Sequence, residues 1–207
     1  MYQLGICFIT DQTYCRLPAC DMVKRVLEAG ITFIQYREKQ RTRREIYDEA
    51  IKLRDLTRSY NAVFIINDHA DIALAVDADG VHLGQDDLPL REARKIMGRK
   101  IVGISTHSLE QAQAAEAGGA DYIGFGPIFH TSTKDAGAPV GVDILKTIKQ
   151  NCSIPVVAIG GISLDTAADV MNAGADAVAV ATAICKGDDI MQNAKRFCDI
   201  IQKNLGG

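Results

Sequence analysis

The stretch Glu116-Ala-Gly-Gly-Ala-Asp-Tyr-Ile-Gly-Phe-Gly126 holds, in order, a helix end, a glycine turn, an aspartate and a short apolar run. The same order, with some substitutions, recurs at 28–35, 75–84 and 172–180. Glycine suits the left-handed turn that ends a helix, and short apolar runs of this kind are typical of buried parallel strands. The repeat therefore predicts one type of helix-to-strand connection that is used four times.

Eight apolar runs along the chain have the length and character of buried strands. They are Leu4–Ile9, Thr32–Tyr36, Val63–Ile66, Gly80–Leu83, Ile101–Ile104, Tyr122–Phe125, Val156–Ile159 and Ala177–Val180. Amphipathic segments between them include Arg43–Ser59, Leu88–Met97, Leu109–Ala117, Leu164–Ala173 and Asp189–Asn204, with candidate N-caps at Thr42, Asp87, Ser108, Ser163 and Asp188.

Eight strand–helix units predict the α/β class and a single (β/α)₈ TIM barrel, with residues 1–207 as one catalytic domain. A doubly wound open sheet is the competing architecture. The repeated connection precedes the second, fourth, sixth and eighth strands, and an open sheet with a switch point gives no reason for that regularity. The barrel is therefore the preferred prediction.

The composition excludes several functional classes. The chain has 207 residues, of which 47% are hydrophobic and 24% charged, which is typical of a soluble globular domain. No apolar run approaches the roughly 20 residues of a membrane helix, the N-terminus shows no secretory pattern, and the net charge of −3 argues against general nucleic-acid binding. We therefore expect a cytoplasmic protein with small-molecule substrates, neither nucleic-acid nor membrane partners, and possible homo-oligomers.

The six cysteines form no C-x-x-C pair and no metal-ligand spacing with histidine. Most of them lie in apolar stretches, where a thiol behaves as a small hydrophobic group. We expect them to be reduced thiols rather than disulfides or zinc ligands.

The second predicted strand runs into a charged segment, Gln35-Tyr36-Arg37-Glu38-Lys39. Side chains alternate along a strand, so Gln35, Arg37 and Lys39 share one face and Tyr36 points the other way. Arginine and lysine together form a clamp for phosphate. The alternative is a solvated run of charges that leads into the next helix.

Two acidic residues follow neighbouring strands, Asp68 after the third and Asp87 after the fourth. Adjacent strands lie about 4.8 Å apart, so carboxylates from the two loops can reach one ion. Mg²⁺ commonly takes one or two carboxylates and completes its shell with water and phosphate oxygens. Helix capping is the alternative explanation for an aspartate at either position.

The later strands end in residues suited to a second phosphate. Thr131-Ser132-Thr133-Lys134 forms a hydroxyl-rich loop, and Gly160-Gly161 and Thr182 follow the seventh and eighth strands, where barrels of this type commonly bind phosphate. A surface loop and a tight glycine turn are the alternatives. The histidines are scattered, and His82 is expected to point into the barrel in an ordinary hydrogen-bonded role.

Six segments in this order resemble the thiamine phosphate synthase family, also called thiamine-phosphate pyrophosphorylase. They are Gln35–Lys39, Ile66–Asp68, Asp79–Asp87, Gly103–His107, Gly126–Lys134 and Ala158–Ile162. The resemblance implies a transferase of thiamine biosynthesis that joins hydroxymethylpyrimidine diphosphate to thiazole phosphate. Pyrophosphate would leave before the thiazole nitrogen attacks.

The same resemblance implies a role for individual residues. The pyrimidine diphosphate would be held by Gln35, Arg37, Lys39, Asn67, Ser105 and Lys134, with Tyr36 and Glu38 of the same segment, and Arg37, Lys39, Ser105 and Lys134 would be catalytic. Mg²⁺ would bind Asp68 and Asp87. The thiazole phosphate would be held by Thr131, Ser132, Thr133, Gly161, Ala181 and Thr182.

Three positions depart from the family pattern: His130 replaces a proline, the segment 134–141 is one residue shorter, and Ala181 is smaller than usual. The nearest rival is the related thiazole tautomerase group, in which a histidine takes the place of Pro127. Pro127 is retained here and both aspartates are present, although His130 lies close by. A non-catalytic phosphate-ligand binder on the same scaffold is a second alternative.

Overall fold

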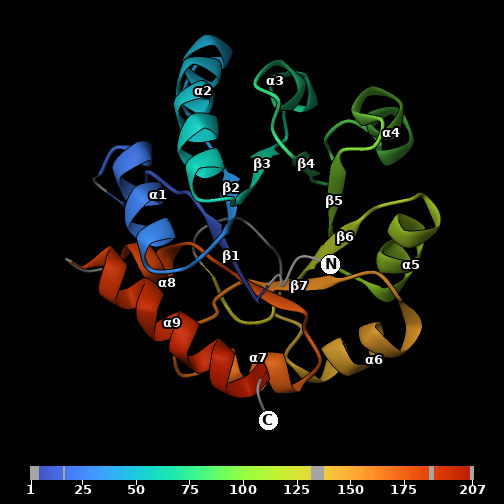
Figure 1. The fold of residues 1–207 in the computed structure, drawn as a ribbon. Coiled ribbons are helices and arrows are strands. Elements are labelled where there is room, and N and C mark those ends of the chain that lie inside the picture. Colours follow the sequence, from blue (N-terminus) through green and yellow to red (C-terminus); the bar gives the residue numbers. More distant parts are fainter. Residues whose placement is uncertain (1–4, 16, 132–137, 187–188, 206–207) are drawn as a thin grey trace.

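The computed structural model describes residues 5–15, 17–131, 138–186 and 189–205, and it shows a closed barrel. Eight parallel strands follow one another around the barrel in chain order, and β1 pairs with β8 to close it. Figure 1 shows the helices as an outer ring around these strands. The predicted (β/α)₈ barrel is confirmed, and the open sheet is excluded.

The strand boundaries agree with the predicted runs to within two residues. The strands are β1 (Gly5–Ile9), β2 (Phe33–Tyr36), β3 (Val63–Asn67), β4 (Gly80–Leu83), β5 (Ile101–Thr106), β6 (Tyr122–Phe125), β7 (Val156–Ile159) and β8 (Ala177–Val180). The helices are α1 (Ala19–Glu28), α2 (Arg43–Ser59), α3 (Ala70–Ala75), α4 (Leu90–Met97), α5 (Leu109–Ala117), α6 (Asp143–Asn151), α7 (Ala167–Asn172), α8 (Thr182–Cys185) and α9 (Ile190–Leu205).

The helix starts correct part of the prediction. Thr42 caps α2 in a capping box with Glu45, and Ser108 caps α5, as predicted. The predicted caps Asp87 and Ser163 are wrong, because α4 begins after Pro89 and α7 after Thr166. Asp188 lies outside the described residues.

The buried side chains form two layers. One fills the barrel interior and includes Cys7, Phe33, Ile65 and Tyr122. The larger layer lies between the sheet and the helices, where Phe8, Phe64, Phe125 and Phe197 are fully buried. Two apolar layers around one sheet hold the strands rigidly, which fixes the positions of the loops at both ends.

The repeated connection lies at the N-terminal end of the barrel. Before β6, Gly119 has φ +84°, and the N–H of Ala120 donates to the carbonyl of Ala115 at 3.0 Å, which is a Schellman helix end. Asp121 then bonds to Val102 on the preceding strand twice: its own N–H donates to the Val102 carbonyl, and its carboxylate accepts the Val102 N–H at 2.8 Å. At this copy of the repeat, the connection thus joins two neighbouring strands by hydrogen bonds.

All six cysteines are free thiols. Over the described ranges, no helix has both the length and the apolar character required to span a bilayer.

Candidate active site

A pocket of about 380 Å³ opens at the C-terminal ends of the strands. In (β/α)₈ barrels this end carries the active site. The predicted site residues around it are Arg37, Ser105, Thr131, Gly161, Ala181 and Thr182. Residues from the loops after β1, β2, β5, β6, β7 and β8 therefore share one cavity.

Arg37 is held at the rim by the end of β1. The Thr10 hydroxyl accepts the Arg37 N–H at 2.9 Å and donates to the Arg37 carbonyl at 3.1 Å. The guanidinium donates to the Asp11 carboxylate at 3.4 Å, and the Asp11 side chain is only 4% exposed. Both the backbone and the charge of Arg37 are therefore positioned before any substrate arrives.

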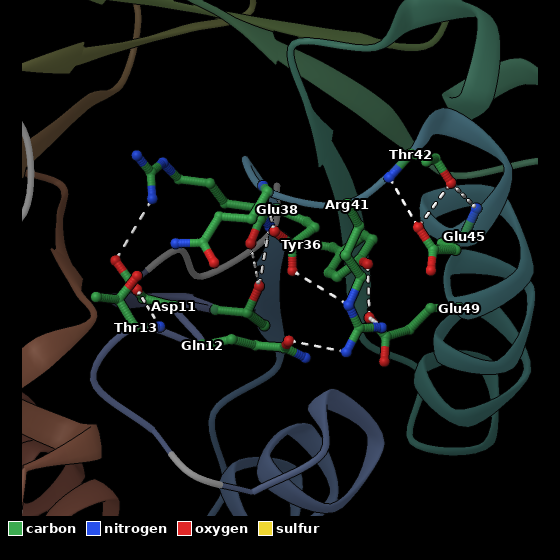
Figure 2. A network of polar contacts seen from close by, with 12 residues as sticks. Asp11, Gln12, Thr13, Tyr36, Glu38, Arg41, Thr42, Glu45 and Glu49 are labelled. Carbon is green, nitrogen blue, oxygen red and sulfur yellow. Dashed lines mark hydrogen bonds and ion pairs between the residues drawn. The ribbon is translucent and has the colours of Figure 1, made fainter.

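The loop that carries Arg37 and Lys39 is fixed by Arg41, as Figure 2 shows. The Arg41 guanidinium donates to Gln12 at 2.9 Å and to Glu49 on α2 at 3.0 Å. It also lies 3.7 Å from Glu38, whose carboxylate accepts the Gln40 N–H at 2.7 Å. Arg41 thus ties the cationic loop after β2 both to the loop after β1 and to α2.

Lys39, Asp68 and Asp87 form a polar cluster beside the pocket. Lys39 pairs with Asp68, which has a left-handed backbone with φ +64° and donates its N–H to the His82 carbonyl at 2.8 Å. Burial raises the pKa of Asp87; the Gly84 N–H opposes this rise, and the neighbouring Asp68 carboxylate adds to it. Asp68 and Asp87 are therefore close enough to interact.

The two carboxylates have the chemistry of a divalent-cation site. Over the part of the chain that the structure describes, no group of three or more His, Cys, Asp or Glu side chains could hold a metal. A pair of neighbouring carboxylates suits Mg²⁺, provided that substrate oxygens and water supply the other ligands. The capping alternative is wrong for both, because His69 and Pro89 occupy the N-cap positions of α3 and α4.

The opposite wall of the pocket is built on two glycines after β7. Gly160 has φ +102° and Gly161 has φ +64°. A Cβ on Gly161 would lie 2.4 Å from the His130 carbonyl oxygen, and one on Gly160 would lie 2.7 Å from Pro127 Cα. The turn therefore needs glycine for its backbone conformation and for the close approach of the loop after β6.

The remaining predicted residues fall into three groups. Gln35 and Asn67 lie near the C-terminal ends of β2 and β3, at the end of the barrel where the pocket opens, and Gln35 is 4% exposed. Tyr36 points outward, as the alternation predicts, and its hydroxyl donates to Glu49 at 2.7 Å, so the structure does not bring it to the pocket. Ser132, Thr133 and Lys134 lie outside the described residues.

Five polar residues that line the pocket were not among the predicted site residues: Asp11, His107, His130, Ser163 and Lys186. Asp11 lines the pocket next to Arg37, Ser163 follows the glycine turn, and Lys186 adds a cation beyond α8. The available signal for Asp11 was the pair of polar residues, Thr10 and Asp11, that follows the buried strand β1. Lys186 follows a four-residue helix that the apolar pattern does not reveal, so nothing local pointed to it.

A parallel barrel with a cationic loop, a carboxylate pair and a glycine turn around one pocket defines a phosphate-handling (β/α)₈ enzyme. The thiamine monophosphate synthase family model matches residues 6–184, and the chain belongs to that family. It is a transferase of the thiamine-phosphate pyrophosphorylase type.

Individual relatives agree with this assignment. The thiamine-phosphate synthase of Chloroflexus aurantiacus is 51% identical over 177 residues, covering 85% of this chain and 82% of that protein. The thiamine-phosphate synthase of Methanospirillum hungatei is 46% identical over 202 residues, covering 95% and 97%. The solved thiamine phosphate pyrophosphorylase from Pyrococcus furiosus superposes with a TM-score of 0.92 at 41% identity, covering 99% of this chain and 98% of that one.

Proposed function

We propose that this barrel condenses hydroxymethylpyrimidine diphosphate with thiazole phosphate, giving thiamine phosphate and pyrophosphate. The observation that carries the proposal is the cluster of Arg37, Lys39, Asp68 and Asp87 directly beside a pocket walled by Gly160 and Gly161. One region suits a diphosphate with a divalent cation, and the other suits a second phosphate. The relatives named thiamine-phosphate synthase support thiamine phosphate as the product.

Arg37 and Lys39 bind the diphosphate and stabilise the charge that develops on it as it leaves. Lys134, which the resemblance places at the same group, supplies a third cation. Asp68 and Asp87 would hold Mg²⁺, which supplies further positive charge to the departing oxygens when bound. Lys39 is paired with Asp68, so it can turn from the carboxylate to the diphosphate when the cation and substrate arrive.

The reaction we propose is a dissociative displacement. The bond between the pyrimidine methylene and the diphosphate oxygen breaks, both electrons leave with pyrophosphate, and the thiazole nitrogen then attacks the methylene cation. The attacking nitrogen carries no proton, so the site needs charge stabilisation rather than a strong base. The fixed guanidinium of Arg37 provides that stabilisation without reorganisation at the moment of bond breaking.

The experiment mixes the purified chain, both substrates and Mg²⁺, and measures thiamine phosphate and pyrophosphate together. Arg37→Gln should lower kcat by about 10²-fold, the loss typical of one charge-stabilising donor. Arg58→Gln, at the other end of the barrel, is the matched control and should retain the rate. Conversion of the thiazole phosphate without pyrophosphate would indicate a tautomerase, and tight binding without turnover would indicate a binding protein.

A further inference from the structure

A chain of hydrogen bonds crosses the barrel interior beneath the pocket. The Tyr122 hydroxyl on β6 lies 2.9 Å from Nδ1 of His82 on β4, and Nε2 of His82 lies 2.9 Å from the Ser105 hydroxyl on β5. Tyr122 is 3% exposed and His82 8% exposed, whereas Ser105 lines the pocket. The chain therefore begins in the closed core and ends at the surface where substrate binds.

Two glycines make room for the rings. A Cβ on Gly103 would lie 2.1 Å from Tyr122 Cζ, and one on Gly124 would lie 3.0 Å from His82 Cε1. The two rings lie 5.4 Å apart between centroids, so each limits the movement of the other. Close packing on this scale leaves His82 little freedom to rotate.

The direction of the hydrogen bonds decides what Ser105 offers to a ligand. Burial raises the pKa of Tyr122 well above its usual value, so the phenol keeps its proton. If that proton is donated to Nδ1, a neutral imidazole carries its own proton on Nε2 and donates it to the Ser105 oxygen. The Ser105 proton is then directed away from His82. In the opposite direction, Ser105 would donate to His82 and present only lone pairs to the pocket.

We propose that Tyr122 and His82 are positioning residues that make the Ser105 hydroxyl a donor toward the diphosphate. An anionic group needs donors, and a serine whose proton is directed into the protein would repel it. Gln85 holds the Ser105 carbonyl at 2.6 Å, so the backbone and the hydroxyl are positioned by different partners. This assignment rests on the proposed function, since it gives Ser105 a diphosphate to bind.

The first test is a double-mutant cycle. Tyr122→Phe removes only the hydroxyl, and we expect kcat to fall about tenfold, as is typical when a positioning partner is lost. In a Ser105→Ala background the same change should cost less, because the Ser105 hydroxyl that Tyr122 orients is gone, and the loss that remains measures the hydrogen bond between the Tyr122 hydroxyl and Gln35. Equal losses in both backgrounds, or no loss in either, would overturn the proposal. Tyr60→Phe, after α2 at the far end of the barrel, is the control.

The second test is a rescue at His82. A glutamine at this position retains an N–H close to the place of Nε2, whereas a leucine of similar size has none. His82→Gln should therefore keep at least fivefold more activity than His82→Leu. Equal activities at equal folded stability would contradict a hydrogen-bonding role.

The third test does not depend on turnover. Nitrogen-15 spectra of the histidine-labelled chain, which has four histidines, report which ring nitrogen of His82 carries the proton. We expect the Nε2–H tautomer, and a shift toward Nδ1–H in Tyr122→Phe. An Nδ1–H tautomer in the unmodified chain would overturn the proposal even if the enzyme makes thiamine phosphate. Failure to make thiamine phosphate would overturn only the proposed function.

Discussion

Aspartates gather at both ends of the barrel, but the two sets are arranged in opposite ways. At the N-terminal end, Asp79, Asp121 and Asp176 each pair with one cation from a helix: Arg54, Arg94 and Lys149. Each carboxylate also accepts the N–H of the first or second residue of the preceding strand, at 2.7–2.8 Å. Each of these three aspartates is thus matched by one cation within the protein.

At the C-terminal end, Asp68 and Asp87 lie together with one lysine, and the pKa of Asp87 is raised. Two carboxylates with one cation carry an unbalanced negative charge, which attracts a metal ion. The difference teaches that charge matched inside the protein stabilises the barrel, whereas charge left unmatched prepares it for a ligand. Substitutions at the two ends should therefore separate activity from stability.

The largest effect is expected at Lys134, which the family resemblance assigns to the leaving group. Lys134→Ala should lower kcat by about 10²–10³, the usual loss for one group that stabilises developing charge. Steady-state kinetics under saturating substrates measures the effect. Lys149→Ala, which breaks a pair at the N-terminal end, is the control and should lower the thermal midpoint while kcat stays within twofold. A loss below threefold for Lys134→Ala would remove Lys134 from the leaving group.

The next largest effect is on stability, at the N-terminal end. Arg54 makes a bidentate pair with Asp79 at 2.8 and 3.1 Å, and its side chain is 11% exposed. Asp79→Ala should lower the free energy of unfolding by about 2–3 kcal/mol, because it leaves a largely buried guanidinium and the Phe64 N–H without their acceptor. Urea denaturation measures the change, and kcat of the folded fraction should be unaffected. Full stability with reduced kcat would reverse the roles we assign to the two ends.

A smaller effect is expected for metal dependence. Asp87→Asn should raise the Mg²⁺ concentration for half-maximal rate by at least about tenfold, since it removes one of two proposed ligands. Its unfolding free energy without Mg²⁺ should not fall, because repulsion from Asp68 is relieved. Asp86→Asn, on the exposed neighbouring position, serves as the control. An unchanged Mg²⁺ requirement would refute the ligand assignment.

The sequence predicted the N-terminal end better than the C-terminal end, for a physical reason. A helix end, a left-handed turn and the start of a strand are consecutive in the chain, so the glycine turn at Gly119 could be predicted from the local sequence. The strands and the outward direction of the Tyr36 side chain could be predicted in the same way, because side chains alternate along a strand.

The partners of the site residues are distant in the chain and could not be predicted in this way. Thr10 meets Arg37 across 27 positions, and His82 meets Tyr122 across 40. In the sequence Asp87 resembled a helix N-cap, because aspartate is favoured both at N-caps and in turns. In the structure its carboxylate accepts the N–H of Gly84 in a turn instead. Residue types at strand ends indicated where the site lies, but the hydrogen bonds that orient it needed the fold.

The smallest expected effect concerns acid stability at the N-terminal end. The hydroxyl of Ser153 and then its N–H lower the pKa of Glu116, with the Ile154 N–H adding to them. A carboxyl with a lowered pKa stabilises the fold at pH values above its unfolded pKa of about 4.3, and this stabilisation is lost as the pH falls through the folded pKa. Glu116→Gln should therefore be less stable than the unmodified chain at pH 7, and the difference should shrink below pH 4.

Urea midpoints of both chains at pH 7 and at pH 3.5 measure this convergence. Glu110→Gln, at the start of the same helix α5, is the matched comparison, because the pKa of Glu110 is lowered by the capping Ser108 rather than by a neighbouring strand. If Glu116 joins α5 to the start of β7, its substitution should cost more than that of Glu110 at pH 7, since it breaks contacts between units rather than within one. A stability difference that does not change with pH would show that the charge of Glu116 contributes nothing, and that only the geometry of its hydrogen bonds holds this end of the barrel.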